Sequence, residues 1–129
     1  MDSLEWVQQL CGQLPMVTEE FPFDQETMVW KVAGKMFCLG DISTFEAIGL
    51  KCDPDFAQEL RAQYPQITHG AYLDKKHWNY VQFEGLPTEL VQALILHSYE
   101  LVVGKLPKSL KTEILAAMPF RSEIDTQKP

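Results

Sequence analysis

Two short segments in which apolar side chains recur at every second residue constrain the fold of this chain most strongly. In the first, Met28, Trp30 and Val32 occupy alternate positions, and this period of two is typical of a β-strand. Gly34 then supplies a tight turn, and residues 35–39 return as the partner strand. The sequence therefore predicts an antiparallel hairpin with its tip at Gly34.

The strand pattern extends beyond this hairpin. A second, looser connection over residues 41–46 leads to another strand over residues 47–52. A last strand is expected over residues 78–83, and residues 66–77 are expected to form a loop or an irregular strand. We therefore expect an antiparallel meander with two hairpin tips, near Gly34 and near residues 41–46.

Four helices are expected around this meander. The clearest start is at Asp53 and Pro54, because Asp53 is a good N-cap and proline is favoured at the first helical position. The helix that begins at Pro87 carries a wide apolar face, which suits packing against a sheet. The expected helices cover residues 3–12, 54–64, 87–105 and 108–117. This order predicts an α+β fold of two layers, with the helices on one face of an antiparallel sheet.

The composition is that of one folded domain. The chain has 129 residues, of which 46% are hydrophobic and 22% charged, and this balance supports a core without metals or disulfides. We expect a single domain over residues 1–118 and a flexible tail over residues 119–129. The three cysteines form no CxxC pair, which favours buried free thiols and no metal or other cofactor. No leader or membrane span is recognisable, so a cytoplasmic protein is expected.

The charge is distributed unevenly along the chain. The net charge of −7 disfavours general affinity for nucleic acids, because phosphate contacts require a cationic surface. Residues 1–30 contain six acidic and no basic residues, which gives −6, whereas residues 31–129 contain 11 basic and 12 acidic residues, which gives −1. A modest basic face is therefore possible only outside the first thirty residues.

Residues 75–80 combine two lysines, a histidine, a tryptophan, an asparagine and a tyrosine in sequence. Such a mixture suits contact with an anion or a nucleic acid backbone, with Lys75 and Lys76 on phosphate and Trp78 stacked on a base. In the alternative interpretation, Trp78 belongs to the core, as large aromatic residues usually do, and the lysines lie on a solvated turn. The alternative is favoured for Trp78, and the two interpretations are balanced for the lysines.

Several segments together resemble the MmcQ/YjbR-like family of small bacterial proteins, long catalogued as a domain of unknown function. The matching segments are Gly34-Lys35-Met36-Phe37, Leu50-Lys51-Cys52-Asp53-Pro54, Lys75-Lys76-His77-Trp78-Asn79, Ser98-Tyr99-Glu100-Leu101-Val102 and Leu106-Pro107-Lys108. The resemblance implies a fold similar to that of bacterial frataxin, the CyaY-like fold. It also implies a "double wing" role in DNA binding, in which hairpin loops project as wings.

On this basis we expect a non-enzymatic DNA-binding domain. The candidate nucleic-acid contacts are Lys31, Lys35, Lys51, Lys75, Lys76, His77 and Asn79. Lysines beside a hairpin turn also protect edge strands from pairing, and this explanation is favoured for Lys31 and Lys35. A third group, Lys105, Lys108 and Lys111, could bind phosphate, although Lys105 is explained equally well by the dipole at the end of its helix.

The remaining functional classes have less support in the sequence. There is no GxGxxG, P-loop, HExxH or GxSxG motif. His97 and Ser98 are adjacent on a helix and therefore point in different directions, so a catalytic pair is not expected and Tyr99 is expected to be buried with its hydroxyl paired. The alternatives are a protein-interaction module with exposed aromatics and an acidic N-terminal region, or a frataxin-like iron binder. The acidic residues in question are Asp2, Glu5, Glu19, Glu20, Asp24 and Glu26.

Overall fold

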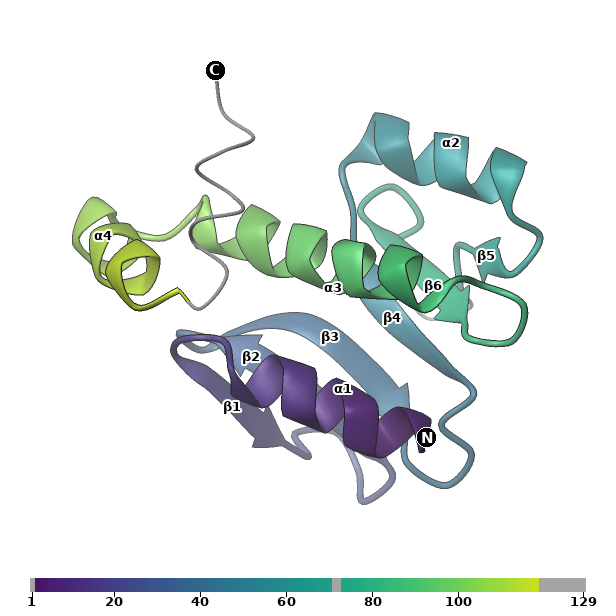
Figure 1. The fold of residues 1–129 in the computed structure, drawn as a ribbon, viewed down its shortest axis with the longest axis horizontal. Helices are drawn as coiled ribbons and strands as arrows, with labels where there is room; N and C mark the ends of the chain where they lie inside the picture. Colours follow the sequence, from purple (N-terminus) through teal and green to yellow (C-terminus); the bar gives the residue numbers. More distant parts are fainter. Residues whose placement is uncertain (1, 71–72, 119–129) are drawn as a thin grey trace.

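The computed structural model describes residues 2–70 and 73–118 of the chain. Six strands and four helices follow one another along these residues, as Figure 1 shows. In chain order they are α1 (Ser3–Gly12), β1 (Val17–Glu20), β2 (Thr27–Val32), β3 (Lys35–Asp41), β4 (Ala47–Lys51), α2 (Pro54–Gln63), β5 (Ile67–Thr68), β6 (Trp78–Gln82), α3 (Thr88–Val103) and α4 (Lys108–Ala117).

The strands form one antiparallel sheet in the order β1-β2-β3-β4-β6-β5. The predicted hairpin joins β2 to β3, and Gly34 at its tip has a φ of 82°, a left-handed conformation that glycine adopts without steric cost. The predicted connection over residues 41–46 joins β3 to β4. The meander predicted from the period of two is thereby confirmed.

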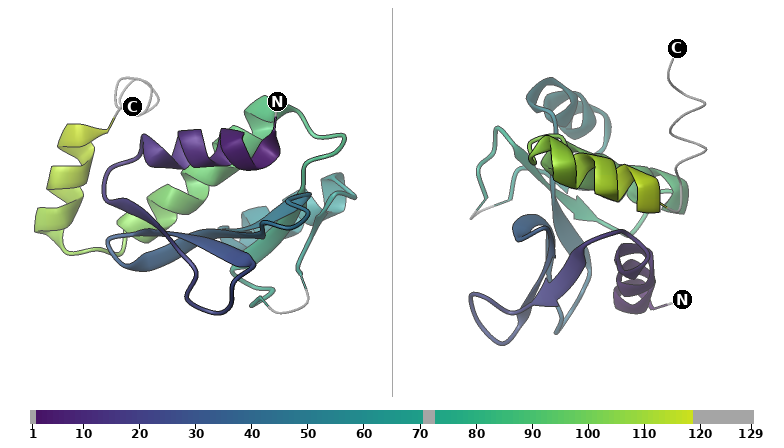
Figure 2. Two further views of the ribbon diagram at one scale, coloured as in Figure 1. Left: turned by 90° about the horizontal axis from the view of Figure 1, so that it is seen from below. Right: turned by 90° about the vertical axis from the view of Figure 1, so that its left-hand side faces the viewer.

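Helices cover one face of this sheet, as the views in Figure 2 show for α1 and α3. Helix α3 lies over β3 and β4 and contributes Ile95 and Tyr99 to the core, where both are buried. The ring of Tyr99 meets that of Phe37 edge-on, with 5.4 Å between the ring centroids. The Tyr99 hydroxyl donates a hydrogen bond to the carbonyl of Pro15 at 2.7 Å. The α+β two-layer fold and the buried, paired Tyr99 are confirmed.

Strand β1 was not predicted individually from the sequence, and β5 lies in residues 66–77, for which a loop or an irregular strand was expected. Strand β1 forms one edge of the sheet by pairing with β2, and the two-residue β5 forms the other edge by pairing with β6. Lys31 and Lys35 therefore lie on β2 and β3, both interior strands, so the interpretation of these lysines as protectors of an edge strand is wrong. The predicted tail, residues 119–129, lies outside the described residues.

The three cysteines, Cys11, Cys38 and Cys52, are buried free thiols, as the sequence predicted. Burial raises the pKa of the Cys52 thiol to about 11. Burial and the neighbouring thiol of Cys11 raise the pKa of Cys38 well above its ordinary value. In residues 2–70 and 73–118, none of the helices has the length and apolar character needed to cross a bilayer.

Strand register places the two hairpin tips at opposite ends of the sheet. Pairing of Cys38 with Leu50 brings the start of β3 beside the end of β4, and pairing of Lys51 with Trp78 adds the start of β6 to the same end. We call this the basic end, because Lys35, Lys51 and the segment 75–77 meet there. The connection over residues 41–46, with Asp41 and Glu46, belongs to the opposite end.

Candidate anion-binding pocket

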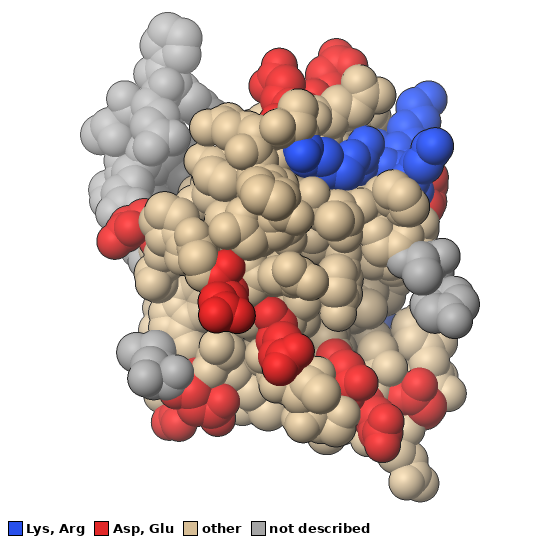
Figure 3. Space-filling model, turned by 90° about the vertical axis from the view of Figure 1, so that its right-hand side faces the viewer, with Lys and Arg blue, Asp and Glu red and all other residues tan. Residues whose placement is uncertain are grey.

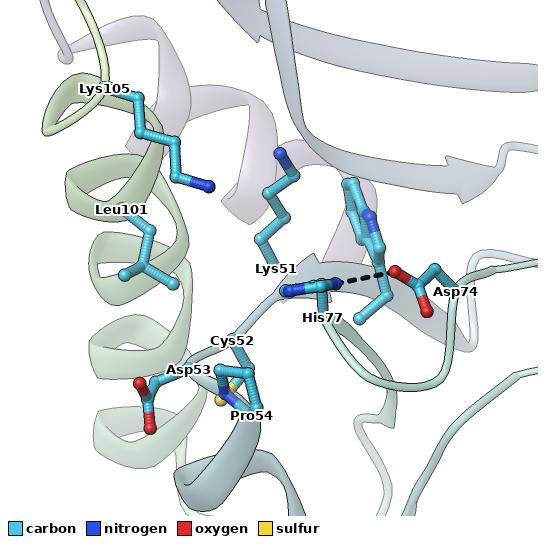
Figure 4. Close-up of a pocket in the computed structure, with 9 residues that line it drawn as sticks. Lys51, Cys52, Asp53, Pro54, Asp74, His77, Leu101 and Lys105 are labelled. Atoms are coloured by element: carbon cyan, nitrogen blue, oxygen red, sulfur yellow. Dashed lines mark hydrogen bonds and ion pairs between the residues drawn. The ribbon is translucent and has the colours of Figure 1, made fainter.

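A pocket of 420 Å³ lies at the basic end of the sheet. Its walls come from the end of β4, the first turn of α2, the segment before β6 and the last turn of α3, as Figure 4 shows. Its volume falls within the range of small-molecule sites. The lining residues are Lys51, Cys52, Asp53, Pro54, Asp74, His77, Trp78, Leu101 and Lys105.

Two lysine side chains from different elements reach into the pocket. Lys51, at the end of β4, and Lys105, just beyond α3, extend toward the same space in Figure 4. Partial burial lowers the pKa of the Lys51 ammonium, and the positive charges of Lys105 and Lys35 lower it further. Within the described residues, no carboxylate forms an ion pair with any of these three ammonium groups. The pocket therefore concentrates positive charge that no acidic side chain neutralises directly.

The position of Lys51 is fixed from both sides. Its backbone N–H donates to the hydroxyl of Ser98 on α3 at 2.9 Å, and this hydroxyl donates to the carbonyl of Phe37 on β3. The Lys51 Nζ lies 5.9 Å from the centre of the Trp78 ring, within the reach of a cation–π contact. One helix thus anchors the strand that carries Lys51, while Trp78 supports the end of its side chain.

His77 and Asp74 are joined by a hydrogen bond at the pocket wall. His77 Nδ1 lies 2.7 Å from Asp74 Oδ2, and the hydrogen bond from the imidazole lowers the pKa of the Asp74 carboxyl. Because Nδ1 is bound to Asp74, the other ring nitrogen, Nε2, faces away from that carboxylate and into the hollow in Figure 4. The His77 carbonyl accepts a hydrogen bond from the backbone N–H of Cys52 at 2.8 Å, which ties this segment to the end of β4.

The carboxylate of Asp53 caps helix α2 and forms no ion pair with Lys51 or Lys105. Its side chain accepts a hydrogen bond from the N–H of Phe56 at 3.2 Å and so caps α2. In Figure 4 it points away from Lys51 and Lys105. The backbone N–H of Asp53 donates to Nε2 of His97 at 3.3 Å, and burial lowers the pKa of this imidazole.

The predicted contact residues have different surroundings. Lys51 and His77 line the pocket, and Lys35 lies close enough to affect the pKa of Lys51. Lys75 and Lys76 are exposed on the segment that leads to His77. The remaining two predicted contacts, Lys31 and Asn79, are engaged elsewhere.

Lys31 forms an ion pair with Glu20 at 3.2 Å. Asn79 is only 2% exposed, accepts a hydrogen bond from Arg61 Nη1 at 2.8 Å and donates one to the carbonyl of Ala57 at 3.4 Å. Both polar ends of this amide are therefore used inside the protein, and the expectation that Asn79 contacts a ligand at the surface does not fit this burial. Trp78 is also buried, with 7% of its surface exposed, which confirms the favoured interpretation that it belongs to the core.

Asp74 and Lys105 are among the pocket residues that the predicted contacts did not include. Asp74 directly precedes the lysine pair, and an aspartate three residues before a histidine was a usable signal for the turn. Lys105 was considered as a possible phosphate contact together with Lys108 and Lys111, and its helix-end position explained it equally well. It joins Lys51 in the pocket through tertiary packing alone, which no local pattern in the sequence encodes.

The acidic residues of the N-terminal region do not gather into a metal site. Glu19 accepts a hydrogen bond from Trp30 Nε1 at 3.0 Å, and Asp24 accepts two from backbone N–H groups of its own turn. Across residues 2–70 and 73–118, no group of three or more His, Cys, Asp or Glu side chains could hold a metal ion. The alternative of an iron site on this surface is therefore not supported.

Charged side chains are unevenly distributed on one face of the molecule. On the face drawn in Figure 3, Lys and Arg side chains gather near one edge, whereas Asp and Glu side chains are spread over much of the remainder. The acidic excess of the whole chain thus leaves room for local positive areas. An anion approaching this protein would be attracted to particular places and repelled from others.

Comparisons with known proteins agree with this architecture. The family model described as YjbR matches residues 12–101. The uncharacterized protein YbdF of Escherichia coli O157:H7 is 36% identical over 106 residues, which cover 81% of this chain and 87% of that protein. The uncharacterized protein YjbR of Escherichia coli K12 is 28% identical over 102 residues, which cover 78% of this chain and 86% of that protein.

Two solved protein structures are similar to this fold. The crystal structure of the Deinococcus radiodurans protein DR2400, which carries the domain DUF419, has a TM-score of 0.82 and 38% identity, and covers 88% of each chain. A protein from Pseudomonas syringae has a TM-score of 0.64 at 20% identity, with 78% of this chain and 98% of that chain covered. This second likeness concerns the fold alone.

Proposed function

The chain belongs to the YjbR family, and from the pocket at its basic end we propose that it is a non-enzymatic protein that binds DNA through phosphate groups. The observation that carries this proposal is the pair Lys51 and Lys105, which reach into one hollow without a carboxylate partner among the described residues. Ammonium groups held close together repel each other, and a bound phosphate relieves that repulsion.

The surroundings of the pocket extend the cationic surface on both sides of Lys51, because β4 lies between β3 and β6. Lys35 lies near Lys51, and the exposed Lys75 and Lys76 precede the pocket residue His77. Successive phosphates of a DNA strand would pass from the pocket along these side chains. Of the two hairpin tips, only the one at Gly34 belongs to this end of the sheet, so we propose contact through a single wing.

The absence of catalysis is part of the proposal. The hydroxyl of Ser98 bonds to the backbone of Phe37 and Lys51, and that of Tyr99 bonds to the carbonyl of Pro15. These groups are therefore occupied in the core and unavailable as nucleophiles. His97 uses Nε2 to accept a backbone hydrogen bond, which leaves it unable to activate a neighbouring hydroxyl through that nitrogen.

Fluorescence anisotropy with labelled duplex DNA over a range of salt concentrations tests the proposal. The double variant Lys51→Gln/Lys105→Gln is expected to bind more weakly, with the slope of log K against log salt reduced by roughly one to two, because each lost phosphate contact releases about one counterion fewer. Lys108→Gln is the matched control, since Lys108 is exposed and does not line the pocket. Undetectable binding at low salt, or equal losses in variant and control, would contradict the proposal.

A second candidate is a protein-interaction module, favoured by two exposed phenylalanines on the segment between β1 and β2. Phe21 is 45% and Phe23 is 68% exposed, and Glu19, Glu20 and Asp24 surround them in sequence. Exposed aromatic side chains are typical of interface hot spots. The acidic neighbours favour a partner whose apolar site is bordered by lysine or arginine.

This candidate predicts a specific loss on truncation of the two rings. With the intact protein as bait, a partner captured by the wild type and lost by Phe21→Ser/Phe23→Ser, but retained by Lys51→Gln/Lys105→Gln, would support it. Thermal melting of the bait variants checks that their fold is unchanged. Identical capture by the wild type and the phenylalanine variant would exclude these rings as the contact.

A further inference from the structure

The pocket at the basic end has features that select among phosphate groups. We propose that it binds a phosphate monoester in its dianionic form in preference to the phosphodiester of an internal DNA linkage. This inference rests on the proposed function and narrows it, because it identifies the kind of phosphate that enters the pocket. Two sources carry this chemistry: the 5′-phosphorylated end of a DNA strand and a free phosphorylated metabolite.

The first argument is charge. Lys51 and Lys105 extend into the pocket, and Lys35 lies near enough to influence Lys51. A phosphodiester carries one negative charge, whereas a monoester carries close to two above the second phosphate pKa of about 6. Since several ammonium charges converge here, the dianion compensates them more fully than the monoanion.

The second argument is the number of donors. Lys51 and Lys105 bring ammonium groups into the hollow from two segments of the chain, and each ammonium group carries three N–H donors. A monoester presents three terminal oxygens and has a single ester link. A diester presents two terminal oxygens, and both of its ester substituents must leave through the mouth of the same pocket. The third terminal oxygen of the monoester therefore adds an acceptor for these N–H donors that the diester lacks.

The third argument is the remaining space. A volume of 420 Å³ exceeds what a phosphate group fills, and Leu101 and Trp78 contribute apolar surface to the lining. A ligand with an organic body attached to the phosphate, such as a nucleoside or a sugar, would fit this combination. An isolated inorganic ion would leave the apolar part of the pocket unused.

Two carboxylates also line the pocket, and their bonding decides whether they oppose an anion. Asp74 is paired with His77 at 2.7 Å and accepts the N–H of Lys76 at 3.1 Å. Asp53 caps α2 and points away from the lysines. Each carboxylate is thus compensated by its own partners.

The first experiment compares two nucleotides that share one body. Adenosine 5′-monophosphate carries a monoester, and adenosine 3′,5′-cyclic monophosphate carries a diester. In ¹H–¹⁵N NMR titrations at pH 7.5, the monoester is expected to shift the indole N–H of Trp78 and to bind at least about tenfold more tightly, since charge-assisted hydrogen bonds are lost in the diester. The indole of Trp30, fully buried and bonded to Glu19, serves as the internal control.

The second experiment separates the two sources of monoester. Matched DNA strands with a 5′-phosphate and with a 5′-hydroxyl are compared for binding to the wild type, to Lys51→Gln and to the control Lys108→Gln. A preference for the 5′-phosphate that Lys51→Gln removes and Lys108→Gln retains supports DNA ends. Binding of the free monoester with no such preference supports a metabolite instead.

The outcomes that overturn the inference differ from those that overturn the proposed function. Equal affinity for the monoester and the cyclic diester, or no response of Trp78 to either, overturns the preference for monoesters even if DNA binds through Lys51. Binding of adenosine 5′-monophosphate together with no binding of any DNA overturns the proposed function and leaves the pocket assignment standing. Retained monoester binding by Lys51→Gln would also overturn the inference.

Discussion

Replacing Ser98 by alanine tests how α3 holds the sheet. Strand β3 pairs with β4 at Cys38 with Leu50 and at Leu39 with Gly49, and just beyond these pairs the Ser98 hydroxyl bonds to both strands. It accepts the N–H of Lys51 and donates to the carbonyl of Phe37. Ser98 is fully buried, so alanine would leave two backbone groups without partners at a site that water does not reach easily.

The expected cost follows from these two groups. A buried donor or acceptor that loses its partner costs about 1–3 kcal/mol, so the two groups in Ser98→Ala should lower the free energy of unfolding by about 2–6 kcal/mol. At roughly 4 °C per kcal/mol for a domain of this size, the melting temperature should fall by about 8–24 °C. Urea unfolding should show a lower midpoint with an unchanged m-value.

A local measurement distinguishes this cause from general damage to the core. Amide hydrogen exchange at Lys51 should accelerate more in Ser98→Ala than exchange at Gly49, whose strand pairing is intact. Ser109→Ala is the control, since Ser109 is exposed on α4 and surface substitutions of this kind usually change stability by less than about 0.5 kcal/mol. A loss below about 0.5 kcal/mol in Ser98→Ala, or unchanged exchange at Lys51, would refute the reasoning.

Three further outcomes are expected. Asn79→Ala should lower the free energy of unfolding by about 1–3 kcal/mol in urea titrations, because Arg61 loses its buried acceptor; a neutral result would show that this amide is dispensable for folding. A thiol reagent at pH 8 should modify Cys52 only at the rate of unfolding, since burial raises its pKa to about 11; rapid labelling of the native protein would contradict this. Hydrogen bonds from Ser43 lower the pKa of Asp41 in the folded state, and hydrogen bonds from the backbone of Thr27 and Glu26 lower that of Asp24. These two carboxylates therefore stabilise the fold above their ordinary pKa of 3.8, and this stabilisation is lost as the pH falls through the lower pKa values of the folded state. The urea midpoints at pH 7 and pH 3 should accordingly differ less in Asp41→Asn/Asp24→Asn than in the wild type.

Local signals in the sequence were sufficient for the elements whose ends are determined by neighbouring residues. Asp53 and Pro54 open α2 through an N-cap bond and a proline at the first turn, and both effects act within four residues. Gly34 likewise determines the β2–β3 turn by its own backbone conformation. In contrast, β1 and β5 are short edge strands that exist only because β2 and β6 offer them free backbone groups, so their local sequence carried little signal.

The candidate site was less accessible to sequence reasoning for the same physical reason. Lys51 and Lys105 lie far apart in the chain and meet because α3 packs on β3 and β4. Asn79 was assigned to a surface contact because it belongs to the polar and aromatic segment 75–80, which begins with two lysines and a histidine. Both Trp78 and Asn79 are buried, and the Arg61 guanidinium, which makes this burial possible, comes from α2.

The two edge strands of the sheet determine whether strands of other molecules can pair with it. At one edge, a foreign strand seeking to extend β1 would have to lie against Glu19 and Glu20, whose carboxylates already have partners in Trp30 and Lys31. At the other, β5 offers a ladder of only two residues. Charged or very short edges discourage strand addition. We therefore expect the protein to resist edge-to-edge aggregation in crowded solution, with sheet growth blocked in both directions.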